Sequence, residues 1–311
     1  MTETAAEKRK KILEDAKKAR IAARKAEAEK KAKEEAEKKK ARDEQTRLRW
    51  PITRLLRSQY FSKGAVIVNV TTIDQAILCQ EVGVTAISAY DKSVQGSAVL
   101  RMSTPESIKR YIGAVLIPVI ANVRIGYFSE AKIMESIGVN LIDESDMLTS
   151  AEVSHISRKR ELGIPTICAV TSLTECLLRI QEGALILRVK GTREGGNITE
   201  ALKYLLAIKN AIDGMRADPP TNTLYGEASI FKPLLDEVVR TGRLPVPLFG
   251  SGGIHTPSDV AIMMENGCDG VFVDNAVFLG LDPETHLKAI MQATKDYKNT
   301  SKMCELSNYF I

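Results

Sequence analysis

Short apolar runs and longer amphipathic segments alternate along most of the chain. Residues 118–123 form one apolar run, residues 129–137 carry apolar side chains at helical spacing, and another apolar run begins at Leu141. Short runs bounded by polar residues are typical of buried strands, and a spacing of three to four is typical of a helix. This stretch therefore predicts strand, helix and strand, with polar side chains such as Asn122 and Asp143 where the strands end.

The same strand–helix unit recurs along the chain. Predicted strands cover residues 66–70, 86–90, 118–123, 141–144, 165–170, 185–189, 245–249 and 270–273. Amphipathic helices are expected between them, for example at residues 72–81, 104–112, 172–181, 199–213 and 257–265. Eight such units predict an α/β fold, a (β/α)8 TIM barrel, whose chemistry takes place at the carboxyl ends of the strands. A doubly wound open sheet is the competing architecture, but no G-x-G-x-x-G turn follows the first strand, which counts against a dinucleotide site.

The beginning of the chain has a different pattern. Residues 4–46 are almost entirely Ala, Glu, Lys and Arg, and Glu-to-Lys pairs recur four residues apart, as in Glu7–Lys11 and Glu27–Lys31. Such pairs stabilise a helix. We therefore predict a charged helical extension over residues 1–48, a short amphipathic helix over residues 49–62, the barrel over residues 63–298 and a short C-terminal tail over residues 299–311.

The charge of the chain is divided between these parts. Residues 1–60 hold 20 Lys and Arg against 11 Asp and Glu, a net charge of +9, whereas the remaining 251 residues hold 24 against 28, a net charge of −4. One interpretation is a solvated helical extension. The other is that residues 1–46 form a docking arm for an acidic partner such as a filament, a nucleic acid or a membrane surface. Basic side chains without interleaved aromatic ones attract charge but do not read bases.

Several classes of protein are excluded by composition. The longest apolar runs have the length of strands, so no membrane span is expected, and the opening residues do not resemble a secretory signal. The cysteines form no C-x-x-C pair and are interpreted as reduced core thiols of a cytoplasmic protein: Cys79, Cys168, Cys176, Cys268 and Cys304. The three histidines lie far apart in sequence. No metal site and no cofactor is predicted.

Two glycine-rich turns follow late strands, at residues 191–197 and 250–254. Glycine lets backbone N–H groups approach an anion, and TIM barrels often bind phosphate near the seventh and eighth strands. Ordinary loop glycine is the alternative interpretation for each turn taken alone.

Several longer motifs carry a resemblance. They are K-G-A-V-I-V-N-V, P-V-I-A-N-V-R-I-G-Y-F, E-A-K-I-M-E-S-I-G-V-N-L-I-D-E-S-D, L-R-V-K-G-T-R-E-G-G-N and F-G-S-G-G-I-H-T-P-S-D-V-A-I-M-M-E-N-G-C-D-G-V-F-V. Over residues 63–297 the chain resembles the synthase subunit of glutamine-dependent pyridoxal 5′-phosphate synthase, the PdxS/SNZ family. The resemblance implies a (β/α)8 barrel in two stacked hexameric rings. It also implies synthesis of pyridoxal phosphate from a pentose phosphate, a triose phosphate and ammonia from a separate glutaminase, with intermediates held on two lysines.

The chain departs from the family at its catalytic positions. Asn69 stands where the resemblance implies an aspartate, and Asn122 stands where it implies the first imine-forming lysine. An amide is neither a carboxylate base nor an amine nucleophile. Tyr127 replaces a histidine, and the loop after the second predicted strand is about four residues shorter than the family's.

The phosphate turns depart as well. Glu194 replaces a glycine in the first turn, and Asp274 with Asn275 replaces the Gly-Ser after the eighth predicted strand. A carboxylate near a bound phosphate repels it. The candidate phosphate-binding positions, treated as degenerate, are Gly191, Glu194, Gly196, Gly252, Gly253, Asp274 and Asn275.

Other family positions are retained. Lys190 matches the second family lysine, with Arg188 close by; Asp143 and Glu144 match the acidic pair, and His155 matches a position in the following helix. One interpretation is residual imine or phosphate chemistry at Lys190. The favoured interpretation is inherited barrel structure, with Lys190 paired to a carboxylate.

We interpret the chain as a catalytically impaired member of this family, and three hypotheses stay open. The first is a non-catalytic subunit that assembles with itself or with an active paralogue in a ring and regulates it. The second is an active enzyme of altered chemistry that uses Lys190 on phosphorylated sugars. The third is a structural scaffold docked through its basic helix. Docking of the glutaminase is left open, because the predicted helix at residues 52–60 occupies the matching place with a different sequence.

Overall fold

A computed structural model describes residues 61, 63–90, 100–191, 197–218 and 232–308, and the structural statements below concern these residues. The chain divides into two units, Met1–Pro51 and Ile52–Ile311. The charged helix predicted at residues 1–48, the amphipathic segment at residues 52–60 and the turn residues Glu194 and Gly196 lie outside the described residues.

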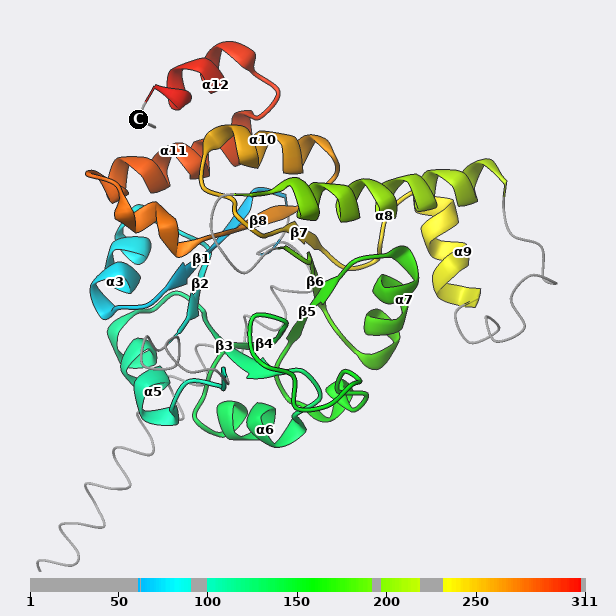
Figure 1. The fold of residues 1–311 in the computed structure, drawn as a ribbon, viewed down its shortest axis with the longest axis horizontal. Helices are drawn as coiled ribbons and strands as arrows, with labels where there is room; N and C mark the ends of the chain where they lie inside the picture. Colours follow the sequence, from blue (N-terminus) through cyan, green and yellow to red (C-terminus); the bar gives the residue numbers. More distant parts are fainter. Residues whose placement is uncertain (1–60, 62, 91–99, 192–196, 219–231, 309–311) are drawn as a thin grey trace, which may run out of the picture. The chain divides into compact units, whose positions relative to one another are not determined.

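Eight parallel strands close into a barrel in sequence order, from β1 through β8 and back to β1. The strands are β1 (Ala65–Val70), β2 (Ala86–Ala89), β3 (Val119–Arg124), β4 (Leu141–Ser145), β5 (Thr166–Val170), β6 (Ile186–Val189), β7 (Leu248–Gly250) and β8 (Gly270–Val273). Figure 1 shows the strands as an inner ring with the helices around it. The predicted (β/α)8 TIM barrel is confirmed, and the open-sheet alternative is wrong.

The helices cover the outside of the barrel (Figure 1). They are α3 (Ile73–Val82), α5 (Pro105–Ala114), α6 (Phe128–Ser136), α7 (Leu173–Glu182), α8 (Thr199–Ala217), α9 (Lys232–Thr241), α10 (Pro257–Glu265), α11 (Pro283–Asp296) and α12 (Thr300–Ser307). Over the stretch that the structure describes, none of them combines the length and the apolar character needed to cross a bilayer.

Polar residues that follow several strands in the sequence cap the N-terminus of the next helix. The N-cap side chains of Thr72, Thr104, Ser172 and Thr256 each accept a hydrogen bond from a backbone N–H three residues later. These bonds satisfy donors that a helix start leaves without an intrahelical partner. Much of the polar character after the strands is therefore helix capping, and only part of it forms a site.

The connection between β4 and β5 contains no α-helix, only the 3-10 turn η1 (Lys159–Glu161). The prediction of a helix in every unit is wrong here, and so is the placement of His155 in a helix. Between Ser150 and Glu161 the large apolar residues are Val153 and Ile156, and Val153 is fully exposed. One buried apolar side chain does not make the stripe that packs a helix onto a sheet.

Side chains inside the barrel form an apolar floor beneath a polar layer. The floor is a buried cluster of Phe61, Ala65, Ile67, Ala86, Ile120, Leu141, Ile167, Ile186, Phe249 and Phe272. Phe249 packs between two rings, 6.3 Å from Phe61 and 5.8 Å from Phe272 between centroids. Residues two positions further along their strands face the same interior, and several of these are polar: Asn69, Ser88, Asn122, Asp143 and Arg188.

Replacement of Phe249 by alanine tests the floor. Phe249 is fully buried, so Phe249→Ala removes its contacts and leaves a cavity in the barrel centre. We expect a loss of about 3–5 kcal/mol in the free energy of unfolding, measured by urea denaturation. Leu281→Ala, at a fully exposed leucine, serves as the control and should change it by less than about 0.5 kcal/mol. Equal effects of the two changes would contradict the assignment of the core.

Candidate functional site at the carboxyl ends of the strands

A narrow cavity of about 30 Å³ opens at the mouth of the barrel. Residues that follow or end the strands line it, including Asn69, Tyr90, Asp143, Asp146, Arg188 and Asp274, together with Gly191, Ser251, Gly252 and Gly253 of the glycine-rich turns. Pockets for drug-sized ligands usually enclose about 300–1,000 Å³. The arrangement thus brings half of the predicted site residues together around a space well below that range.

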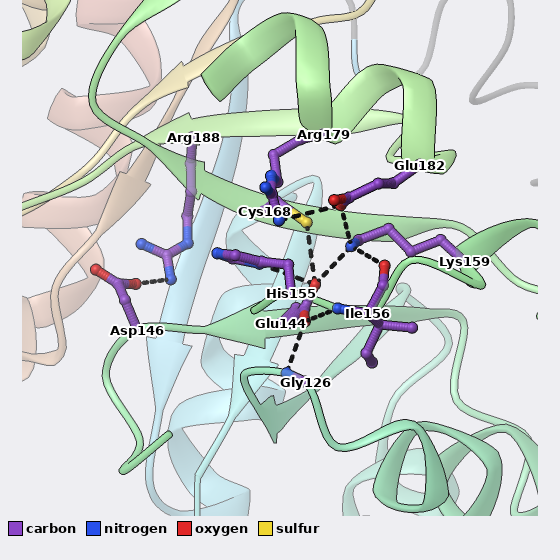
Figure 2. A network of polar contacts seen from close by, with 10 residues as sticks. All are labelled: Gly126, Glu144, Asp146, His155, Ile156, Lys159, Cys168, Arg179, Glu182 and Arg188. Carbon is purple, nitrogen blue, oxygen red and sulfur yellow. Dashed lines mark hydrogen bonds and ion pairs between the residues drawn. The ribbon is translucent and has the colours of Figure 1, made fainter. Parts of the chain in front are cut away.

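Arg188 lines this mouth and is held by two carboxylates. Its Nε lies 3.0 Å from Asp143 Oδ2, and its Nη2 donates to Asp146 and lies 3.5 Å from Ser145 Oγ. Figure 2 shows the pairing of Arg188 with Asp146. Arg188 is 4% exposed, and its guanidinium carbon lies 5.8 Å from the centre of the Phe272 ring. The guanidinium is therefore already bound by the protein.

The same contacts affect the ionisation of Asp143. Burial raises the pKa of Asp143, the positive charge of Arg188 lowers it, and the negative charge of Asp146 raises it, to about 6 in balance. Asp143 Oδ1 is buried and has no hydrogen-bond partner in the described part of the protein. Burial of the Asp143 carboxyl group therefore outweighs the stabilisation of its charge by Arg188.

Asn122 lies beside Asp143 in the β3–β4 register and faces the barrel interior. It is 4% exposed, and its Nδ2 donates to Ser88 Oγ on β2 at 2.9 Å. Its Oδ1 is buried without a partner among the described residues. The position where the resemblance implies an imine-forming lysine is therefore occupied by a buried amide tied to the neighbouring strand.

Lys190 follows β6 and is exposed. Its backbone N–H donates to Val170 O at 2.9 Å. Within the described residues no carboxylate forms an ion pair with its ammonium group, so the expected pairing of Lys190 with a carboxylate is not found there. Lys190 thus remains available to solvent at the edge of the mouth.

The two glycine-rich turns contact each other. A Cβ placed on Gly191 would lie 2.2 Å from Gly252 Cα, and Ser251 Oγ donates to Val189 O. Gly252 and Gly253 have φ values of +86° and +85°, which favour glycine. Backbone packing alone therefore requires glycine at positions that the sequence suggested for phosphate.

Asp274 and Asn275 follow β8 and start the 3-10 helix η3 (Asn275–Leu279). Asp274 Oδ1 accepts from Asn275 N at 2.7 Å, and Asn275 Nδ2 donates to Thr71 Oγ1 at 3.0 Å. Asp274 also lines the cavity, where its charge opposes binding of a phosphate.

Glu144 and His155, both predicted for the site, lie on the outer side of the barrel wall and not at its mouth. Glu144 Oε1 accepts from the backbone N–H groups of Gly126, at 2.9 Å, and Ile156, at 2.6 Å. Glu144 Oε2 lies 2.8 Å from Lys159 Nζ and 3.0 Å from His155 Nδ1 (Figure 2). Successive strand residues face opposite sides, so Asp143 points into the barrel and Glu144 points away from it. The two adjacent carboxylates therefore lie in separate environments.

A buried ionic network surrounds Glu144. The side chain of Lys159 is fully buried, and its Nζ lies 2.8 Å from both Glu144 and Glu182, which also contacts Arg179 at 3.0 Å. Burial raises the pKa of Glu144, but contact with His155 and the charge of Lys159 lower it, to about 2. Burial lowers the pKa of Lys159, yet its anionic surroundings, Glu144 and Glu182 included, hold it above its ordinary value. Glu144 and Lys159 therefore stay charged at neutral pH.

The ligand types in this network also suit a metal, because donor atoms of Glu144, His155 and Cys168 lie within 4.8 Å of one another. The ammonium of Lys159 contacts the same Glu144 oxygen that lies near His155, and burial raises the pKa of the Cys168 thiol well above its usual range. A cation next to a protonated thiol disfavours a second cation. These residues fit an ion-pair network better than a metal centre.

Sequence reasoning missed three of these positions. Tyr90, assigned to a strand, lines the cavity, and its hydroxyl lies 2.9 Å from Met147 Sδ. Asp146 binds Arg188. Its position directly after β4 could have identified it as a residue of the site. Lys159 carried no such signal, since it stands in the charged run R-K-R-E, which usually indicates a solvated surface.

Comparison with known proteins identifies the family of this chain. The model of the SOR/SNZ family matches residues 55–251. The pyridoxal 5′-phosphate synthase subunit PdxS of Natranaerobius thermophilus is 41% identical over 255 residues, which are 79% of this chain and 85% of that protein. The subunit PDX1.1 of Arabidopsis thaliana is 39% identical over 271 residues, 85% of this chain and 87% of that protein. The probable subunit SNZ2 of Saccharomyces cerevisiae is 39% identical over 254 residues, 79% and 85% respectively.

The closed parallel barrel, with its polar residues at the carboxyl ends of the strands, defines a TIM-barrel protein. The chain belongs to the SOR/SNZ family. The resemblance seen in its motifs is confirmed, and the relatives named above are pyridoxal 5′-phosphate synthase subunits.

Replacement of Glu144 by glutamine tests the network. Glu144→Gln leaves Lys159 buried with one carboxylate fewer, so we expect a loss of about 3–5 kcal/mol in the free energy of unfolding at pH 7. Because the pKa of Glu144 is lowered in the folded state, its contribution is complete above about pH 4.5 and is lost as the pH falls toward 2. The difference between variant and parent should shrink over that range in urea titrations.

Glu161→Gln is the matched control. Glu161 pairs with Arg158 at the surface, and both side chains are more than half exposed. This change should leave stability nearly unchanged at every pH. A Glu144→Gln variant as stable as Glu161→Gln would show that the ionic network is not needed.

Proposed function

We propose that this chain is a pyridoxal 5′-phosphate synthase-like barrel that does not synthesise the cofactor and acts as a regulatory or structural subunit of a ring-shaped oligomer. The observation that carries the proposal is Asn122. Its amide is buried and bonded to Ser88 where the resemblance implies a lysine amine. An amide nitrogen does not form an imine with a sugar carbonyl.

The shape and charge of the mouth support the same proposal. The cavity of about 30 Å³ is far smaller than a pentose phosphate requires, and Arg188 is bound by Asp143 and Asp146. A phosphate would have to displace one of these carboxylates and tolerate Asp274 nearby. Each of these conditions weakens binding of phosphorylated sugars.

Lys190 favours a second candidate function. It is exposed and forms no ion pair among the described residues, so its amine is accessible. An accessible amine at the carboxyl end of a barrel strand suits imine chemistry on a small phosphorylated sugar. This enzyme of altered chemistry would use one lysine where the resemblance implies two.

Synthesis and adduct formation separate these two functions. We expect no formation of pyridoxal phosphate from ribose 5-phosphate, glyceraldehyde 3-phosphate and ammonium salt, measured by product absorbance. Borohydride treatment with ribose 5-phosphate should leave the mass of the intact chain unchanged. A mass gain that disappears in Lys190→Met would establish the second function, and steady product formation would overturn the first.

Asn122→Lys sharpens this test. This single change restores an amine, but Asn69, Asp274 and the occupied Arg188 remain, so we expect no recovery of synthesis. Substantial activity in this variant would show that the phosphate turns work as they stand.

The basic N-terminal segment supports a docking role for the assembly. Residues 1–60 carry a net charge of +9 and the rest of the chain −4. In a ring of many copies, weak contacts of the arms with an acidic partner would add up through avidity. The partners proposed are other copies of this chain, an active paralogue and an acidic surface bound by residues 1–46.

Deletion of residues 1–46 tests the arm. The described barrel has its own buried core, so we expect the truncated protein to remain folded and to keep its oligomeric state in light scattering. Co-sedimentation with cell extract should be lost, and attachment of the full chain should weaken steeply with added salt. Attachment that survives the deletion and resists salt would place the partner surface on the barrel.

A further inference from the structure

A second cavity lies at the opposite end of the barrel from the mouth. It has a volume of about 270 Å³ and is lined by residues of both α8 and α10. Lys63, which precedes β1, Leu248, with which β7 begins, and Asp269, which precedes β8, also line it. Parallel strands of a barrel all begin at the same end, so this cavity lies at the amino-terminal ends of the strands.

One part of the cavity wall is apolar. Leu205, Ile208 and Ile212 recur at a spacing of three to four residues and therefore share one face of α8. Met264 of α10 and Val246 before β7 add to the same lining. Sites for small molecules are usually lined by apolar side chains with a few polar groups, and they enclose about 300–1,000 Å³. This cavity lies just below that range, so it suits a small molecule with an apolar body.

Charged side chains of both signs also line the cavity. Arg243 donates to Asp269, and Asp269 Oδ2 accepts from Leu248 N at 3.0 Å, so the protein itself already binds these two groups. Four exposed charged side chains of the lining form no ion pair within the described part of the chain: Lys63, Lys209, Asp213 and Glu265. Two ammonium groups and two carboxylates are therefore available to a ligand.

Two helices end at this cavity. α9 ends at Thr241 and α10 ends at Glu265, and the residues that follow them, Gly242 and Asn266, are part of the lining. The C-terminus of a helix carries about half a unit of negative charge and favours a cation nearby. An ammonium group of a ligand is thus favoured at these helix ends, and the two lysines favour a carboxylate. The cavity suits a ligand that carries both charges.

We propose that this cavity binds a free amino acid with an apolar side chain of about the size of leucine. The apolar side chain lies against α8, the ammonium group lies toward Glu265 and the two helix ends, and the carboxylate lies toward Lys63 and Lys209. Active sites of TIM barrels lie at the carboxyl ends of the strands, so this is a binding site and not a second catalytic centre. The proposal is independent of whether the mouth carries out synthesis.

Titration calorimetry of the full-length protein at pH 7.5 tests the proposal directly. The probes are L-leucine, isopentylamine, which is leucine without its carboxylate, and 4-methylpentanoate, which is leucine without its ammonium group. We expect one leucine to bind to each chain. Each analogue should bind at least about tenfold more weakly, because hydrogen bonds to charged groups are among the stronger contacts of a site. An analogue that binds as tightly as leucine would overturn the proposal.

Variants connect binding to the cavity. Leu244→Trp, at a half-buried position of the lining, fills the cavity and should abolish leucine binding. Glu265→Gln should reduce the preference for leucine over 4-methylpentanoate, and Lys209→Gln should reduce the preference for leucine over isopentylamine. Lys203→Gln is the matched control, because Lys203 is exposed on the same helix and does not line the cavity. This control should bind all three probes as the parent does.

A crystal of the parent protein soaked in free L-selenomethionine gives a measurement that does not depend on how the variants fold. Selenomethionine is an apolar amino acid similar in size to leucine, and its selenium atom can be located by anomalous scattering. We expect a selenium peak in contact with Ile208 or Met264, inside the cavity. Leucine binding that is unchanged in Leu244→Trp, or the absence of a selenium peak from the cavity, would overturn the proposal.

Discussion

Alternation of side chains in a closed parallel barrel determines where every polar group of this protein can act. A strand residue faces either the enclosed interior or the layer beneath the helices, and its neighbour faces the other side. Asp143 and Glu144 are adjacent in sequence yet serve separate environments, one beside Arg188 and the other beside Lys159. The mouth and the outer network are therefore two separate groups of interacting side chains, although both include a residue of β4.

The outer network compensates for an element that the barrel lacks. No helix covers the connection between β4 and β5, but Glu144 binds backbone N–H groups from the segments after β3 and after β4. Lys159 extends the contact to Glu182 on α7. Ion pairs and backbone hydrogen bonds thus hold the loops after β3 and β4 and the helix α7 together, at a place where a packed helix would otherwise do so. Burying these ions is costly, which is why each one has more than one partner.

The sequence predicted the barrel and most of its mouth because both depend on local patterns. Apolar runs gave all eight strands to within about three residues, and the largest error, at β7, arose because Pro245 and Pro247 precede Leu248 and cannot donate to a ladder. The missing helix before β5 and the burial of Lys159 depend on contacts between distant segments, which no local pattern reports. The separation of Glu144 from Asp143 was within reach of the sequence, since period-two alternation alone implies it.

The contact between Gly191 and Gly252 has a consequence for how families of this kind are interpreted. Any side chain at Gly191 would collide with the backbone of the opposite turn, so folding by itself selects glycine there. A descendant that stopped binding phosphate would keep this part of the signature for as long as it kept the barrel. Retained glycine motifs therefore record architecture, and the history of an activity must be traced through the side chains that would carry its chemistry, such as the one at position 122.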